Sequence, residues 1–396
     1  MTAIAIAFRR WLQTAAGLRP WQVGLAAAAV NLVYLIARFM VAAHGVIGAL
    51  IVAGSNFVTA AQVPVHLPVL PGAGYDGQFY FRIALAPFDF ARHAFGVTLD
   101  GAFRLQRVGY PLVAWLLSFG SAHLLLYALP LVNLAALAGL AWVLAKLAVA
   151  SGKHPLFGLL VALYPGYALS LGRDLTEPMA AFTLVLGLYQ LERKRYLPAA
   201  LMLSVSVLTR EASTLIVMAI GVTWLLAFLR RRGGDSSGGM FLAAALPTVA
   251  FFAWQAVVVS QAGHFVLAGF AASNLGLPFT HMVPAILNRL ASPLGTANLL
   301  WFLQFAGLFL VVVTALVVLR RSEAPLYVKI ALVAALALMV SLTGGEWSGN
   351  ADLRSLDPLW LMAWLILFRT RRLDLARWSP LVAVWLVTAA QLVLFI

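Results

Sequence analysis

The stretch Ala122–Val149, AHLLLYALPLVNLAALAGLAWVLAKLAV, carries a single formal charge, on Lys146. A helix of about 20 apolar residues crosses the hydrocarbon core of a bilayer, because each residue advances the helix axis by about 1.5 Å. The stretch therefore predicts a membrane-spanning helix.

The rest of the chain has the same character. Of its 396 residues, 63% are hydrophobic and 10% are charged, and the mean hydropathy is +0.95. This composition leaves lipid as the solvent and predicts an all-α polytopic membrane protein of about eleven transmembrane helices. The other apolar runs are Trp21–Ala43, Pro155–Leu171, Pro178–Leu191, Tyr196–Leu208, Ser213–Leu229, Met240–Ser260, Leu299–Leu319, Leu326–Thr343, Leu356–Phe368 and Pro380–Ile396.

One flexible linker, Gly233–Gly239 (GGDSSGG), divides the predicted helices into two groups. An N-terminal module, 1–232, contains a long first loop at 44–121, and a C-terminal module covers 240–396. The N-terminal arginines follow a short apolar start and precede a full-length apolar run, which indicates an uncleaved anchor rather than a signal peptide.

The loop 44–121 has two interpretations. His44–Val63 contains no Asp, Glu, Lys or Arg and could itself span the membrane. Val108–Gly120 would then have to span with only 13 residues. We therefore expect both stretches to be interfacial or re-entrant helices.

The charges predict the orientation. With the N-terminus in the cytoplasm, 18 of the 27 Lys and Arg residues lie inside and eight lie outside, while nine of the 13 acids lie outside. Cytoplasmic loops of membrane proteins carry the excess of basic residues. The net charge of +14 thus reflects topology rather than nucleic-acid binding, and the C-terminus is expected outside. The 23 arginines against four lysines, with abundant alanine, suggest a bacterial inner-membrane protein.

The first candidate site lies in the outside loop, in GAGYDGQFYFR at 72–82. A carboxylate such as Asp76 at the membrane surface could accept a proton from an acceptor hydroxyl. The alternative is that Asp76 caps an interfacial amphipathic helix, FYFRIALAPF.

Two further charge clusters lie at or near the same face. Arg173, Asp174 and Glu177 occupy a turn between two spans, where Thr176 could instead simply cap the next helix. Arg210 is expected below the outer surface, and intramembrane ionisable residues usually face a pathway or a partner. The alternative there is a structural pair of Arg210 with Glu211 or Asp174.

A fourth candidate is the late outside loop Gly344–Pro358, where Arg354 could clamp a phosphate, since a guanidinium matches phosphate oxygens bidentately. The alternative is an ordinary polar loop. The chain has no cysteine, no HExxH or HxH spacing and no P-loop, so neither a zinc site nor nucleotide-powered chemistry is expected.

These features resemble the GT-C superfamily of polytopic glycosyltransferases. The superfamily includes polyprenyl- and dolichyl-phosphate-sugar-dependent mannosyltransferases, lipid A aminoarabinose transferases and protein O-mannosyltransferases. The likeness covers nearly the whole chain: one span, a long outside loop with an Asp, then short-looped hairpins. It is most similar to a bacterial branch in the motifs GYDGQFY at 74–80, FRLQRVGYPLVAWL at 103–116, SLGRDLTEPMA at 170–180 and LTREAS at 208–213.

The resemblance implies an inverting transfer of a hexose or pentose from a polyprenyl-phosphate-linked sugar, at the extracytoplasmic face. The acceptor would be lipid-linked, a glycan or a protein. Asp76 would be the general base, with the donor phosphate held by Arg210, Arg354 and Arg173. The supporting or acceptor-binding residues would be Asp174, Glu177, Glu211, Tyr75, Gln78 and Tyr80.

Many relatives carry two acids in the first-loop motif, whereas here Gly77 and Gln78 follow Asp76. A divalent metal is therefore possible but not favoured, and no cofactor is implied with certainty. The alternative function is a transporter or lipid flippase of envelope glycan precursors, which would need charge near the bilayer midplane and related halves with broken helices.

Overall fold

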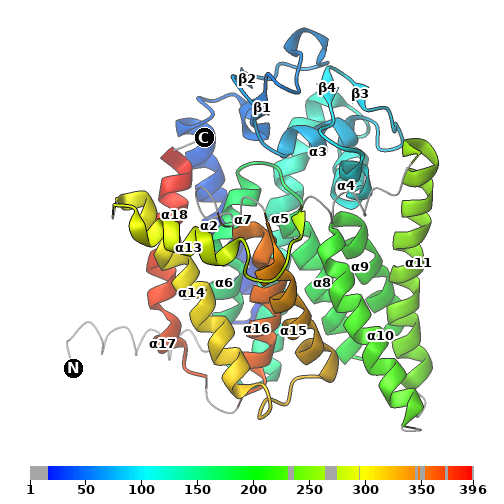
Figure 1. The fold of residues 1–396 in the computed structure, drawn as a ribbon, viewed down its shortest axis with the longest axis vertical. Coiled ribbons are helices and arrows are strands. Elements are labelled where there is room, and N and C mark those ends of the chain that lie inside the picture. Colours follow the sequence, from blue (N-terminus) through cyan, green and yellow to red (C-terminus); the bar gives the residue numbers. More distant parts are fainter. Residues whose placement is uncertain are drawn as a thin grey trace.

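The protein is mainly helical, with the helices standing side by side in a bundle and a loop segment, residues 44–121, covering one end (Figure 1). The computed structural model describes residues 17–230, 236–263, 274–293, 295–343, 347, 353–370 and 373–394. The helices of the bundle are α2 (Pro20–Val41), α5 (Ala122–Ala150), α6 (Phe157–Ala162), α7 (Pro165–Leu171), α8 (Glu177–Glu192), α9 (Tyr196–Thr209), α10 (Thr214–Leu229), α11 (Ser236–Ala262), α14 (Thr296–Val318), α15 (Leu326–Ser341), α16 (Asp357–Phe368) and α18 (Pro380–Leu394).

Membrane-length helices are present, as predicted. Within the described residues, six helices are long and apolar enough to cross a bilayer: Pro20–Val41, Ala122–Ala150, Glu211–Leu229, Gly238–Ala262, Thr296–Val318 and Leu375–Leu394. Tyr196–Thr209, Met282–Ala291 and Leu326–Ser341 are shorter apolar helices. The total of about eleven spans stays a prediction.

Two predicted elements are wrong in detail. The predicted span Pro155–Leu171 is broken into α6 and α7, with Tyr164 at a ψ of 132° between them. Pro165 explains the break, because proline disfavours helical geometry in the residue before it. In the predicted linker, Ser236–Gly239 form the first turn of α11, and residues 233–235 lie outside the described part.

The loop segment consists of short elements rather than the predicted helix at 44–63. That stretch forms the 3₁₀ turns η1 (Ile47–Ile51) and η2 (Ala60–Gln62), with strand β1 (Ala53–Gly54) between them. It therefore forms neither a continuous spanning helix nor an interfacial one, and Leu50, Ile51 and Val58 are buried in the fold. The second predicted helix is present, as α4 (Gly109–Leu117). The remaining loop elements are β2 (Val69–Leu70), α3 (Gly77–Leu85), β3 (His93–Ala94), β4 (Val97–Thr98) and η3 (Ala102–Gln106).

A backbone-to-backbone contact fixes the turn that precedes Asp76. Strand β1 pairs in parallel with β2, and a Cβ added to Gly54 would lie 2.1 Å from the backbone nitrogen of Gly74. Gly74 itself has a φ of 64°, a conformation that glycine adopts without steric cost. The chain can therefore pass this closely only as glycine against glycine, which sets the position of the two residues that follow.

The loop segment is packed onto the bundle. One core cluster combines Ile51, Tyr80 and Phe81 of the loop with Leu125 and Leu129 of α5. Helix α3 is buried from Gly77 to Ala84, so it packs within the loop segment instead of lying on lipid as an amphipathic helix. A rigid platform of this kind can hold side chains in fixed positions.

The loop segment shares its end of the bundle with the turns that carry the other predicted site residues (Figure 1). These are the turn between α7 and α8, the turn η4 (Glu211–Ser213) between α9 and α10, and the turn η5 (Leu353–Leu356) before α16. Helix α18 also ends on this side, whereas α17 (Leu375–Trp378) lies toward the opposite end (Figure 1). Which end faces the cytoplasm stays a prediction.

Candidate functional site

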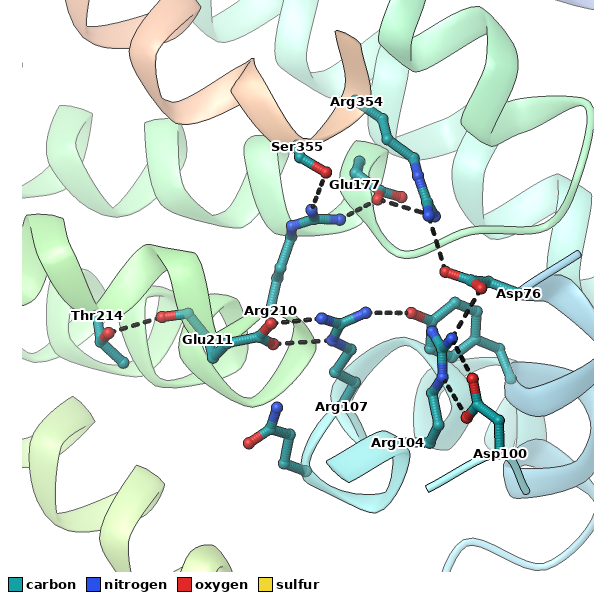
Figure 2. A network of polar contacts seen from close by, with 12 residues as sticks. Asp76, Asp100, Arg104, Arg107, Glu177, Arg210, Glu211, Thr214, Arg354 and Ser355 are labelled. Atoms are coloured by element: carbon teal, nitrogen blue, oxygen red, sulfur yellow. Dashed lines mark hydrogen bonds and ion pairs between the residues drawn. The ribbon is translucent and has the colours of Figure 1, made fainter. Parts of the chain in front are cut away.

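Asp76 lies immediately before α3, but its side chain does not cap that helix. Its Oδ1 accepts a hydrogen bond from Arg104 Nη2 at 2.9 Å, and its Oδ2 accepts one from Arg354 Nη2 at 2.8 Å (Figure 2). The capping alternative is therefore wrong. The carboxylate joins the loop segment to a turn that lies 278 residues further along the chain.

Gly77 brings Asp76 against the bundle. A Cβ added at residue 77 would lie 2.3 Å from the carbonyl oxygen of Arg173, in the turn between α7 and α8. A second acid at position 77 would push the loop segment away from this turn. The close packing of the two segments thus requires glycine at position 77.

The surroundings of Asp76 keep it ionised. Burial alone would raise the pKa of this carboxyl, but the Arg354 and Arg104 guanidinium groups outweigh burial and hold its pKa well below the usual range. Arg104 also binds both carboxylate oxygens of Asp100, at 2.9 and 2.8 Å, and lies 4.7 Å from the ring centre of Phe79. Asp76 is therefore an anion between two fixed cations.

Arg354 connects Asp76 to a second buried acid. Glu177, the first residue of α8, is fully buried, and its Oε1 lies 3.5 Å from Arg354 Nη1. The same oxygen forms an ion pair with Arg210 Nη1, and Oε2 accepts a hydrogen bond from Ser170 Oγ at 3.0 Å. Arg210 therefore pairs with Glu177, and neither Asp174 nor Glu211 takes that place.

Glu211 instead pairs with an arginine of the loop segment. Arg107 Nε donates to Glu211 Oε2 at 2.8 Å, and its Nη2 pairs with Oε1 of the same carboxylate. Arg107 Nη1 donates to the Tyr80 hydroxyl at 2.8 Å. This two-pronged contact ties the loop segment to the start of α10 beside the Arg210 group (Figure 2).

The buried Arg107–Glu211 pair is expected to stabilise the fold. The two side chains are 6% and 11% exposed, so Arg107→Ala or Glu211→Ala leaves one charge without its partner. Each single change is expected to lower the free energy of unfolding by about 3–5 kcal/mol. The double change is expected to cost less than the sum, with a coupling of about 0.5–3 kcal/mol. Unfolding in detergent with increasing SDS measures all three variants.

The matched control is the pair Arg369–Glu192, whose side chains are 27% and 23% exposed. Its removal is expected to cost at most about 1 kcal/mol, because solvent screens such pairs. If the double variant lost as much free energy of unfolding as the two single variants together, the contact between Arg107 and Glu211 would not be directly stabilising.

Tyr75 and Gln78 of the GYDGQFY motif have different roles. The Tyr75 ring lies 4.3 Å from the Arg173 guanidinium and 5.0 Å from that of Arg354, so it holds both cations near Asp76. Gln78 binds backbone only: its Oε1 accepts from Gly54 N at 2.9 Å and its Nε2 donates to the Ala73 carbonyl at 2.8 Å. Gln78 therefore positions the turn before Asp76. A role for Gln78 in acceptor binding stays a prediction.

Asp174 stands apart from this network. It is 1% exposed with a φ of 52°, and among the described residues neither carboxylate oxygen has a hydrogen-bond partner. Burial raises the pKa of Asp174 and the nearby Arg38 offsets this only in part, so that the pKa is about 8. The left-handed turn at Asp174 lies before Glu177, and the alternative of an Arg210–Asp174 pair is wrong, since Arg210 pairs with Glu177.

Asp174 should make stability depend on pH. Its folded pKa of about 8 lies above the unfolded value of about 3.9, so the folded chain binds the proton more tightly. Stability is then fully present below pH about 4 and falls as pH rises toward 8, by up to about 1.4 kcal/mol per pH unit. Asp174→Asn is expected to remove this slope. Unfolding at pH 5 to 8 in both proteins tests it, and equal slopes would contradict the assignment.

Several contacting residues have no counterpart among the sequence predictions. They are Asp100, Arg104, Arg107, Ser355 and the buried Asp357. The two arginines stand three residues apart within FRLQRVGYPLVAWL, and this spacing in a sparsely charged chain is the signal that could have indicated them.

The late loop is only partly described. Glu346, Asn350 and Asp352 lie outside the described residues. Arg354 contacts both Asp76 and Glu177, so for this residue the alternative of an ordinary polar loop is wrong. Within the described ranges, no group of three or more His, Asp or Glu side chains could hold a metal ion.

No protein-family model and no curated protein matches the chain. Among solved structures it is similar to an oligosaccharyltransferase of Archaeoglobus fulgidus, crystallised with a tethered acceptor peptide containing the NVT sequon. The TM-score is 0.40 and the identity 12%, and the match covers 93% of this chain and 55% of that chain. The chain thus spans about half the length of that protein, and a likeness of this size says nothing about activity.

The side chains themselves show what the site can do. Two groups of ion pairs lie side by side at one end of the bundle (Figure 2). One group joins Arg104, Arg354 and Arg210 to Asp100, Asp76 and Glu177. The other is the Arg107–Glu211 pair. Guanidinium groups bind phosphate bidentately, and a carboxylate can accept a proton. The arrangement therefore suits chemistry on an anionic ligand with a hydroxyl partner.

Proposed function

We propose that the chain is a membrane glycosyltransferase of the GT-C type. It would transfer a hexose or pentose from a polyprenyl-phosphate donor to a lipid-linked, glycan or protein acceptor at the extracytoplasmic face of a bacterial inner membrane. The observation that carries the proposal is Arg354, which is shared between Asp76 and Glu177 with Arg210 on the same glutamate.

The donor phosphate would be held by arginines. Arg210 and Arg354 meet at one carboxylate oxygen, so a phosphate that replaced this contact could accept hydrogen bonds from both forks. Arg173 would add a further positive charge, since it stacks on the same Tyr75 ring as Arg354. The polyprenyl chain would remain in the bilayer beside the apolar helices.

Phosphate binding would also prepare the base. While Arg354 and Arg104 both hold Asp76, its low pKa makes it a weak proton acceptor. A phosphate that draws Arg354 away would remove one of these two charges and raise the pKa of Asp76. Binding of the donor would thereby switch on the base.

The transfer itself would be a single displacement with inversion. The acceptor hydroxyl oxygen attacks the anomeric carbon and forms the new glycosidic bond. The bond from that carbon to the phosphate oxygen breaks, and its electron pair leaves with the polyprenyl phosphate. The hydroxyl proton passes to Asp76, while Arg210 and Arg354 stabilise the charge that develops on the phosphate. Glu177 and Glu211 would hold the arginines in place.

A donor screen tests the proposal. The purified full-length chain is reconstituted in proteoliposomes with a panel of polyprenyl phosphate sugars and an acceptor extract, and release of polyprenyl phosphate is followed. Donor-dependent release that Asp76→Asn abolishes supports the proposal. Movement of the intact lipid-linked sugar across the bilayer without bond cleavage would establish the transporter alternative instead.

A further inference from the structure

A cleft with a volume of about 680 Å³ is lined in part by α17, the helix that lies toward the end of the bundle opposite the loop segment (Figure 1). Its walls come from α14, the end of α16, the region of α17 and the turn after α5. The volume falls within the range of about 300–1,000 Å³ that is usual for small-molecule sites. None of the residues of the arginine network contributes to it.

One wall of the cleft runs along a membrane-length helix. Leu310, Thr314 and Val318 of α14 line it, and their spacing of four residues places them on one face of the helix. The eight steps from Leu310 to Val318 correspond to about 12 Å of helix. The cleft therefore extends along α14 from its C-terminal end, with Leu367 of α16 also in its lining.

The other part of the lining is polar and basic. Lys153 enters from the turn after α5, and Arg377 from α17. Asp374 is the acid in the lining, and it is partly occupied: its Oδ1 accepts from Ala376 N at 3.0 Å, and its Oδ2 lies 4.0 Å from Arg377 Nε. Two cations against one acid leave the mouth of the cleft positive.

We propose that this cleft binds one anionic phospholipid, with its phosphate at Lys153 and Arg377 and an acyl chain along the apolar wall of α14. A small soluble anion would leave that wall uncovered. A zwitterionic lipid carries no net negative charge to match the basic mouth. Basic clefts between transmembrane helices are suited to anionic head groups, and this end of the chain carries its predicted excess of arginine and lysine.

Native mass spectrometry of the full-length chain tests the site. Phosphatidylglycerol and phosphatidylcholine with the same acyl chains are titrated separately, and the first bound lipid is quantified. Phosphatidylglycerol is expected to bind more tightly. Lys153→Gln and Arg377→Gln are each expected to weaken its binding about fivefold, the effect of one basic residue near an anionic surface.

The matched control is Arg195→Gln, which removes the same charge from the start of α9, outside the cleft lining. It should leave phosphatidylglycerol binding unchanged. Thr314→Trp keeps every charge but fills the apolar wall, and it should weaken phosphatidylglycerol binding as well. The proposal would be overturned if Arg195→Gln weakened phosphatidylglycerol binding as much as the changes at Lys153 and Arg377. It would also be overturned if the two lipids bound equally, or if Thr314→Trp left phosphatidylglycerol binding unchanged. Thermal unfolding of each variant shows that loss of binding is not loss of fold.

Discussion

Replacing Asp76 with asparagine is expected to lower the rate of sugar transfer by about 10²–10⁴-fold, the usual cost of losing a general base. Asparagine keeps the shape of the side chain but cannot accept the proton of an acceptor hydroxyl. The variant is also expected to fold. Arg104 keeps its two bonds to Asp100, and Arg354 keeps Glu177, so neither guanidinium is left without a counter-charge.

Asp100→Asn is the matched control for this experiment. Asp100 also binds Arg104 in the same loop segment, but its side chain is 27% exposed and Arg354 binds Asp76 instead. Its loss should change the transfer rate by no more than about threefold, because partly exposed pairs contribute little. Release of polyprenyl phosphate per enzyme molecule measures both variants. Transfer by Asp76→Asn within the same range as Asp100→Asn would rule out a base at residue 76.

The sequence indicated most of the members of this network but not their pairing. Asp76, Glu177, Arg210 and Arg354 stand out because charge is rare in the chain, with only 10% of residues charged. Their contacts join residues 33 to 278 positions apart, and no local pattern encodes such distances. Asp174 and Glu177 lie in one short run, and only the start of α8 and the left-handed turn before it decide which of them meets Arg210.

The loop segment shows a second reason for the same difficulty. His44–Val63 lacks charge because Leu50, Ile51 and Val58 are buried inside the loop segment, not because lipid surrounds it. A run without charged residues is equally compatible with a protein interior and with lipid. Arg104 and Arg107 have no site role among the sequence predictions, whereas the structure buries and pairs both. The long apolar runs were easier to predict as helices, because a run of about 20 apolar residues is typical of a membrane span and rare in soluble proteins.

The largest expected effect on binding concerns Arg210. Arg210→Ala is expected to weaken binding of polyprenyl phosphate about 10- to 100-fold, the loss of a charge-assisted hydrogen bond in a buried site. Arg210→Lys should bind better than the alanine variant but worse than wild type, because lysine offers the charge without the fork. Arg210 is 7% exposed and contacts Glu177 and Ser355, so its removal alters a closed environment rather than a surface.

Two controls separate the phosphate from other causes. Polyprenol without a phosphate should bind equally to all three proteins, since Arg210 recognises only the head group. Arg92→Ala removes an arginine from the exposed part of the loop segment, where Arg92 Nε donates to the Leu99 carbonyl at 3.4 Å. It should leave polyprenyl phosphate binding unchanged. A uniform loss across both ligands would point to damage to the fold.

Arg210→Ala also leaves a buried acid without its closest cation. Glu177 is fully buried, and without Arg210 it would keep Arg354 at 3.5 Å and draw that arginine away from the ligand. The double variant Arg210→Ala with Glu177→Gln removes this acid charge together with the arginine. It is expected to unfold at a higher temperature than Arg210→Ala alone, because an unpaired buried charge is costly. Its affinity for polyprenyl phosphate should nevertheless stay low, since one of the two forks is still missing. Arg210 would be a structural residue only if the double variant bound polyprenyl phosphate as tightly as wild type. The same conclusion would follow if Arg210→Ala and Arg210→Lys both bound it with unchanged affinity.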